Sequence, residues 1–150
     1  MIQSKRTSRP TRRRRAAMRE ADYEALARFR YQVRTFLAFS EAAAQRAGLT
    51  PQQHQALLGI KGLASAASVG DIARFLLIRH HTAVELMGRM AKLKLIVRTV
   101  DPEDARRVRL KLTAKGEQKL RSLSKIHLEE LRAASPALSK ALRSIQSGTR

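Results

Sequence analysis

The segment from Arg79 to Lys92 carries side chains that can hydrogen-bond to nucleotides. On a helix of about 3.6 residues per turn, one face is apolar (Ala83, Val84, Met87, Met90 and Ala91) and the other polar. Arginine pairs bidentately with guanine, threonine contacts the thymine methyl group, and histidine and glutamate donate to or accept from other base edges. A solvated face on an ordinary amphipathic helix has the same pattern. The side chains with this potential are Arg79, His80, His81, Thr82, Glu85, Arg89 and Lys92.

The residues after this helix predict a β-hairpin with a basic tip. Segments 96–100 and 108–113 are rich in β-branched residues in alternation, which is typical of strands. The loop between them, residues 101–107, starts with Asp101-Pro102, where proline fixes the entry into the turn. It ends with Arg106 and Arg107, and arginines at a hairpin tip can enter a narrow minor groove. A helix, a turn, a polar-faced helix and a hairpin form the layout of a winged helix-turn-helix.

The stretch from Val69 to Gly116 resembles the multiple antibiotic resistance regulator (MarR) family of bacterial transcription factors. The specific part is DPEDARRVRLKLTAKG, which matches the wing motif of that family through Asp104, Arg106, Leu112, Thr113 and Gly116. Segments 69–73 and 78–86 resemble the start of the helix-turn-helix and the turn into its recognition helix, and the resemblance extends from residue 23 to residue 145. The chain departs from the family at Lys94, where glycine is usual, and at Gly88, where a polar residue is usual.

The resemblance implies a mainly α (α+β) fold and a division of labour in the wing. Arg106 would enter the minor groove, and Asp104 would hold its direction through a charge-assisted hydrogen bond. Without that role, the two residues would form only a surface ion pair worth at most about 1 kcal/mol. Ser68 is expected to cap the helix that begins at Val69, whose first N–H groups would contact a phosphate.

Composition and charge favour a polyanionic partner. The 150 residues suggest one domain, and 43% hydrophobic but only 4% aromatic residues favour a helical protein. The chain has no cysteine, which excludes disulfides, thiolate metal sites and cysteine-based redox sensing. The formal net charge is +19, of which residues 1–19 contribute eight basic and no acidic side chains, so the remainder is still basic. No apolar segment is long enough for a transmembrane helix or a secretory signal, so a cytoplasmic protein is expected.

The chain divides into a basic arm at residues 1–19, expected to be disordered, and a single domain at residues 20–150. The arm could track phosphates or be only a solvated tail. Within the domain, the winged helix-turn-helix is expected at about residues 50–113. A long helix at 22–47 and two helices within 114–147, the last capped by Ser135-Pro136, lack intramolecular partners. The family resemblance implies that they form a homodimer interface.

Other functions have weaker support in the sequence. The four histidines do not form a metal-binding pattern, and neither a phosphate loop nor a nucleophile elbow is present, so we expect no enzyme, cofactor or metal. His54 could line a ligand pocket, although a locally bonded structural histidine is more common. Few aromatic residues argue against single-stranded or RNA targets.

The sequence therefore predicts a homodimeric regulator, most simply a repressor, that reads a palindromic double-stranded operator. Two recognition helices about 34–36 Å apart would occupy successive major grooves. The resemblance also implies a small aromatic or phenolic effector, although no residue of this chain identifies it. The alternative is an architectural protein that binds DNA by charge with little sequence preference.

Overall fold

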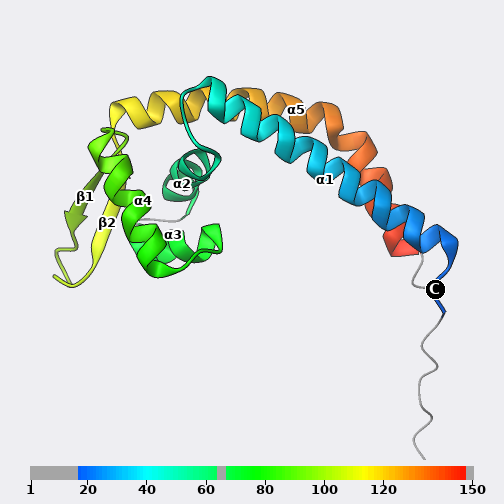
Figure 1. Ribbon diagram of the computed structural model, residues 1–150, viewed down its shortest axis with the longest axis horizontal. Helices are drawn as coiled ribbons and strands as arrows, with labels where there is room; N and C mark the ends of the chain where they lie inside the picture. Colours follow the sequence, from blue (N-terminus) through cyan, green and yellow to red (C-terminus); the bar gives the residue numbers. More distant parts are fainter. Residues whose placement is uncertain (1–16, 64–66, 148–150) are drawn as a thin grey trace, which may run out of the picture.

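The fold is mainly helical with one two-stranded sheet, as the sequence predicts (Figure 1). The computed structural model describes residues 17–63 and 67–147, so most of the basic arm lies outside the described residues. The elements, in chain order, are α1 (Glu20–Arg46), α2 (Pro51–Gly62), α3 (Val69–Leu76), α4 (His80–Lys92), β1 (Ile96–Val100), β2 (Val108–Leu112) and α5 (Ala114–Ser147). None of the helices in this part of the chain combines the length and apolarity needed to cross a bilayer.

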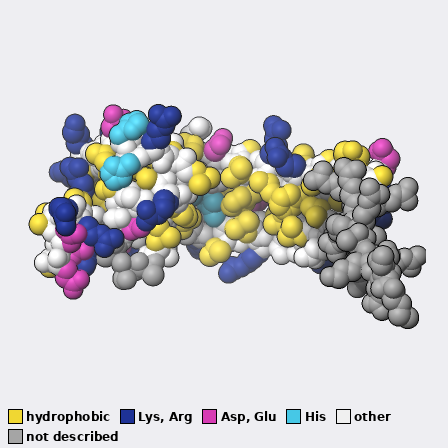
Figure 2. All heavy atoms as spheres, turned by 90° about the horizontal axis from the view of Figure 1, so that it is seen from below, with side chains coloured by type: hydrophobic (Ala, Val, Ile, Leu, Met, Phe, Trp, Pro, Cys, Tyr) yellow, Lys and Arg dark blue, Asp and Glu magenta, His cyan; other side chains and the backbone are white. Residues whose placement is uncertain are grey.

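The long helices α1 and α5 run side by side in opposite directions, away from a lobe formed by α2, α3, α4 and the hairpin (Figure 1). Small residues let their backbones approach closely, and Ala25, Ala43, Ala44 and Ala141 are buried between helices. Much larger apolar side chains stay exposed, and Figure 2 shows hydrophobic side chains gathered where α1 and α5 run. These exposed side chains are Tyr23, Leu26, Tyr31 and Leu37 on α1, and Leu128, Leu131 and Leu142 on α5.

Side-chain caps define where the helices of the lobe begin. The Thr50 hydroxyl accepts the Gln53 N–H at 3.1 Å, while the Gln53 side chain accepts the Thr50 N–H at 3.0 Å. Ser68 and Asp71 form the same reciprocal box at the start of α3. Each box satisfies N–H groups that the first helical turn leaves without partners, so the predicted helix starts at Pro51 and Val69 are confirmed.

The apolar face of α4 anchors it in the core of the lobe. Met87 and Met90 are fully buried together with Leu86, which the helical-wheel analysis had not assigned to that face. The prediction that Val84 lies on the buried face is wrong, because Val84 is 43% exposed. The buried face of α4 is therefore rotated slightly from the predicted one, and Val84 lies beside the hairpin.

The C-terminal region is one helix, and the prediction of a separate last helix starting at Ser135-Pro136 is wrong. Helix α5 continues through Pro136 to Ser147 (Figure 1). Proline removes only its own N–H from the helix, and the flanking turns of α5 stay packed along α1. Ser135 is therefore an interior helical residue and not an N-cap.

A tight junction joins the end of α4, the start of β1 and the start of α5. The Thr113 hydroxyl donates to the Lys94 carbonyl at 2.6 Å and accepts the Gly116 N–H at 3.1 Å, as expected of an N-cap. Lys94 follows α4 with φ of 57°, so this lysine adopts the left-handed conformation usually given to glycine. At Gly116, a Cβ atom would lie 2.2 Å from the Leu95 carbonyl oxygen, which explains why glycine stands there.

We predict that Gly116→Ala destabilises the fold, because the added methyl group would overlap backbone that cannot rotate away. The expected loss in the free energy of unfolding is about 1–3 kcal/mol or more, measured by chemical denaturation. Gly88→Ala is the matched control, since a Cβ there meets nothing within 4 Å and alanine favours the helix by about 1 kcal/mol. Equal effects of the two substitutions would contradict the junction argument.

Candidate nucleic-acid interface

The predicted polar face of α4 is open to solvent. His80, His81, Glu85, Arg89 and Lys92 are exposed, and Thr82 is half-buried. Arg79 occupies the N-cap position, where its side chain caps nothing and remains exposed. With 13 residues, α4 is about 20 Å long, and its slender cylinder fits a major groove roughly 12 Å wide. The burial of Met87 and Met90 on the opposite side fixes which residues face outward.

Several cations on this side of the lobe remain available to a partner. Among the residues that the structure describes, the ion pairs involve none of Arg79, Arg89, Lys92, Arg98 and Arg107. An unpaired exposed cation loses no intramolecular bond when it contacts a phosphate, and it releases counterions from the nucleic acid. Figure 2 shows Lys, Arg and His side chains at the lobe end of the molecule.

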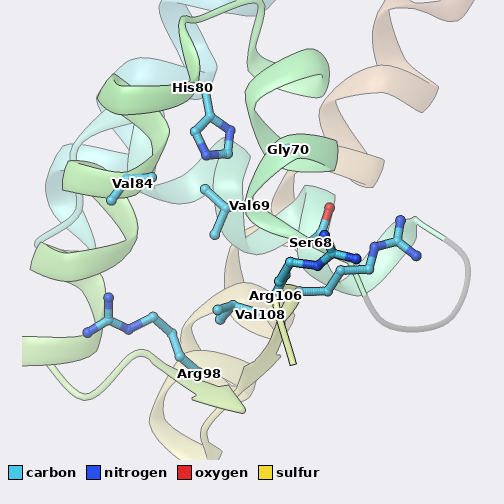
Figure 3. A pocket seen from close by; sticks show the side chains of 9 residues that line it. Ser68, Val69, Gly70, His80, Val84, Arg98, Arg106 and Val108 are labelled. Carbon is cyan, nitrogen blue, oxygen red and sulfur yellow. The ribbon is translucent and has the colours of Figure 1, made fainter. Parts of the chain in front are cut away.

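A hollow of about 350 Å³ lies between α3, α4 and the hairpin (Figure 3). Its apolar lining comes from Val69, Val84 and Val108, one from each of the three elements. The polar lining consists of Ser68, His80, Arg98, Arg106 and Arg107, and Figure 3 shows Arg98 and Arg106 on opposite sides of Val108. The structure therefore brings together the start of α3, the start of α4 and the hairpin tip around one basic depression.

The start of α3 is ordered by its own acidic residue. The Ser68 hydroxyl donates to the Asp71 carboxylate at 2.9 Å and accepts the Asp71 N–H, so its hydrogen bonds are used within the protein. The backbone N–H and hydroxyl of Ser68, with Arg74 beside them, hold the pKa of Asp71 below its usual value. Ser68 thus positions the helix start, and it lines the hollow together with Val69 and Gly70.

Asp104 orders the backbone of the hairpin tip more than the side chain of Arg106. Its carboxylate accepts the Arg106 N–H at 3.0 Å, whereas the Arg106 Nε is 3.5 Å away. The Arg106 side chain is 93% exposed. The expected charge-assisted bond between the two side chains is therefore long, and Arg106 is directed mainly by the backbone that carries it.

Two features of the hairpin escaped the sequence analysis. Arg98 on β1 lines the hollow beside the predicted residues. Asp101 and Arg109 form a two-bonded ion pair at the base of the hairpin, with Nε–Oδ2 and Nη2–Oδ1 distances of 3.0 Å. The alternation of the strands could have indicated that Arg98 faces outward. The ion pair between Asp101 and Arg109 could be predicted only from the strand register, in which Val100 faces Val108.

A buried histidine pair lies where α1, α2 and α5 meet. His54 is only 4% exposed, and its ring lies 4.7 Å from that of His127. His127 donates from Nδ1 to the Leu123 carbonyl at 2.6 Å, so its Nε2 is left to accept the Ser40 hydroxyl at 2.7 Å. Within the described part of the chain, the Nδ1 of His54 has no hydrogen-bond partner. His54 is therefore buried, as the structural alternative expected, but its Nδ1 does not form the local hydrogen bond of that alternative.

Other binding chemistry is not assembled in the described part of the chain. Neither stretch 17–63 nor stretch 67–147 brings three or more histidine or acidic side chains together in a group that could hold a metal ion. Around α4 and the hairpin, the described residues instead bring together exposed cations that take part in none of the ion pairs. This arrangement, on this fold, defines a winged helix-turn-helix DNA-binding protein.

One family model matches part of this chain. Residues 47–107 match the model of the MarR family. This match agrees with the predicted resemblance to MarR-family winged helix-turn-helix regulators, which are a class of DNA-binding proteins and not of enzymes. Among curated proteins, no relative matches this chain.

Solved structures share the fold at low sequence identity. A variant of MepR from Staphylococcus aureus, bound to an oligodeoxyribonucleotide, has a TM-score of 0.63 and 21% identity over 85% of this chain and 98% of its own. AbsC from Streptomyces coelicolor, a MarR family transcriptional regulator, has a TM-score of 0.68 and 19% identity over 88% and 96%. BpsR from Bordetella bronchiseptica, whose DNA binding is regulated by 6-hydroxynicotinic acid, has a TM-score of 0.56 and 21% identity over 78% and 89%.

We predict that acidification destabilises the protein through His54. Burial, and then the neighbouring His127, lower the pKa of His54 below its ordinary value of 6.5. The unfolded chain therefore binds the proton more readily, so the stability that neutral His54 contributes is complete above pH 6.5 and is lost as the pH falls below it. Unfolding midpoints of wild type measured between about pH 8 and 5 should fall with pH. His54→Phe should flatten that dependence, while His81→Gln, at an exposed position, should leave it unchanged.

Proposed function

We propose that this protein is a homodimeric repressor that binds a palindromic operator through α4 and the hairpin, which we call the wing. The observation that carries the proposal is the convergence of the start of α3, the polar face of α4 and the arginine-tipped wing on one basic surface. A regulator that acts on DNA works in the compartment that holds the DNA, which supports the expected cytoplasmic location.

Each side chain of the interface has a role that its exposure permits. Arg89 pairs with guanine in the major groove, Thr82 contacts a thymine methyl group, and His81 and Glu85 reach other base edges. Arg79, His80 and Lys92 contact phosphates at the groove edges, and the first N–H groups of α3, ordered by Ser68, contact another. In the wing, Arg106 enters the minor groove, Arg107 follows the adjacent backbone, and Asp104 holds the tip in shape.

The exposed apolar surface of α1 and α5 supports a homodimer. Side chains such as Leu26 and Leu142 are large and exposed along two helices that bury mostly small residues between them. A contiguous apolar surface of this kind on a soluble chain marks an interface. A two-fold dimer also places two copies of α4 on one side, as reading a palindrome requires. On this division, residues 22–47 and 114–147 dimerise and residues 50–113 bind DNA.

A small aromatic or phenolic acid remains the proposed class of effector. BpsR, which shares the fold, responds to 6-hydroxynicotinic acid. An effector that binds one dimer arrangement better than another would shift the spacing of the two α4 helices and release the operator. No residue of this chain is assigned to that ligand.

The DNA proposal is tested by selecting bound duplexes from a randomised pool at two salt concentrations. Wild type should select a palindrome. Arg106→Ala should weaken binding about 10-fold or more, flatten the preference at the A·T flanks, and reduce the salt slope by about 0.9, the value for one lost phosphate contact. Arg121→Ala removes the same charge from an exposed site on α5 and should change little.

The opposite result would favour the architectural alternative. In that case no motif would be selected, affinity would collapse with salt, and Arg106→Ala would resemble Arg121→Ala. Arg89→Ala distinguishes the two further, because a residue that reads a base changes the selected sequence and not only the affinity.

The dimer is tested by sedimentation equilibrium. Leu26→Glu should shift the protein from dimer to monomer, because a charge at the centre of an apolar interface is left without a partner. Leu58→Glu is the matched control on α2, since the two leucines are 46% and 45% exposed in the single chain. A monomeric wild type, or equal behaviour of the two variants, would refute the proposed interface.

A further inference from the structure

The base of the wing is closed by an ion pair between buried Asp101 and half-buried Arg109. Asp101, at the end of β1, is only 7% exposed, and Arg109 on β2 grips both of its carboxylate oxygens at 3.0 Å. The Glu103 N–H also donates to Asp101 Oδ1 at 2.9 Å, and the Asp101 N–H donates to the Arg107 carbonyl at 2.8 Å. The Glu103 N–H and then the Arg109 guanidinium hold the pKa of Asp101 below its usual value. The carboxylate therefore stays charged and fully bonded.

This pair holds the loop at both of its ends, whereas the tip depends on the loop backbone. Asp101 begins the seven-residue loop 101–107, and its bonds reach Glu103 and Arg107 within the loop and Arg109 beyond it. Among the hydrogen bonds and ion pairs of residues 17–63 and 67–147, by contrast, the Arg106 side chain has only the long contact to Asp104. The direction of Arg106 and Arg107 is thus set by the shape of a loop that Asp101 closes.

Arg109 also connects the wing to the start of α3. Its backbone forms an isolated β-bridge with Ser68, and the adjacent Leu110 N–H donates to the Ala67 carbonyl at 2.9 Å. One residue therefore joins Asp101 through its side chain and the N-cap of α3 through its backbone. The wing and the start of α3 border the same hollow, so their separation is fixed by this connection.

We propose that Asp101 and Arg109 are positioning residues for DNA binding, which aim the wing arginines and themselves make no contact with DNA. The proposal rests on the proposed minor-groove role of Arg106. An acidic residue beside phosphates ordinarily weakens DNA binding. On this proposal, Asp101 instead strengthens DNA binding, because it orders the wing arginines.

Whether Asp101 strengthens DNA binding is tested by comparing Asp101→Asn with Glu103→Gln. Each substitution removes one negative charge from the same loop, and the exposed Glu103 side chain takes part in none of the hydrogen bonds or ion pairs of the described residues. Glu103→Gln should bind the selected operator as tightly as wild type or more tightly. Asp101→Asn should bind it about 10-fold more weakly and lose preference at the A·T flanks. Binding of Asp101→Asn that equals or exceeds that of Glu103→Gln would overturn the proposal.

Arg109 is tested by the salt dependence and by a double substitution. If Arg109 acts only through Asp101, Arg109→Gln should weaken binding without changing the salt slope, and Asp101→Asn/Arg109→Gln should bind no more weakly than either single variant. A slope reduced by about 0.9 in the Asp101→Asn background would show a direct phosphate contact by Arg109 and overturn the positioning role.

Two measurements distinguish the positioning role of Asp101 and Arg109 from a general folding defect and from failure of the proposed wing function. A purely structural defect would lower the unfolding midpoint and weaken binding to all duplexes alike, leaving the selected flanks unchanged, so that result would also overturn it. The same experiment includes Arg106→Ala. If Arg106→Ala binds like wild type, the proposed wing function itself fails. If Arg106→Ala is impaired while Asp101→Asn is not, only the positioning role fails.

Discussion

The contact between Gly116 and the Leu95 carbonyl is the constraint on which the rest of the structure depends. Because no Cβ intervenes, α5 begins directly against the backbone that leaves α4. The Thr113 N–H donates to the Leu95 carbonyl at 3.0 Å, and Lys115 Nζ donates to the Leu93 carbonyl at 3.0 Å. The end of α4, the start of β1 and the start of α5 therefore share one set of hydrogen bonds. Any displacement of the long helices would reach α4 and the wing through this junction.

The lobe and the long helices are built on different packing principles. In the lobe, buried Leu, Ile and Met side chains hold α4 so that its polar face is turned outward. Along α1 and α5, small buried residues allow close approach while larger apolar residues remain exposed. Where the two parts meet, Lys119 Nζ donates to the Ala47 carbonyl at 2.6 Å and Lys61 pairs with Glu117, so α5 is tied to both α1 and α2. The large apolar side chains left exposed on α1 and α5 support the proposed homodimer.

Local sequence signals predicted much of this structure because local interactions determine it. The helix starts at Thr50 and Ser68 follow from capping boxes that span only three residues. The outward residues of α4 follow from helical periodicity, which placed exposed Val84 on the buried face and did not assign buried Leu86 to it. The prediction failed at Pro136, where packing along α1 outweighs the local preference of proline for a first helical turn. It also gave no sign of the His54–His127 contact, which joins residues far apart in the chain.

The sequence by itself determined the kinds of elements, the basic charge and the residues that face outward on α4 and at the wing tip. These properties depend on residue types and on spacings of a few positions. Only the tertiary structure decided that Arg109 pairs with Asp101, that Arg98 lines the hollow, and that Asp104 holds the backbone of Arg106 more closely than its side chain. Each of these depends on strand register and on how separate elements are packed, because such distances are fixed by contacts between residues that are remote in sequence or by the exact course of a loop.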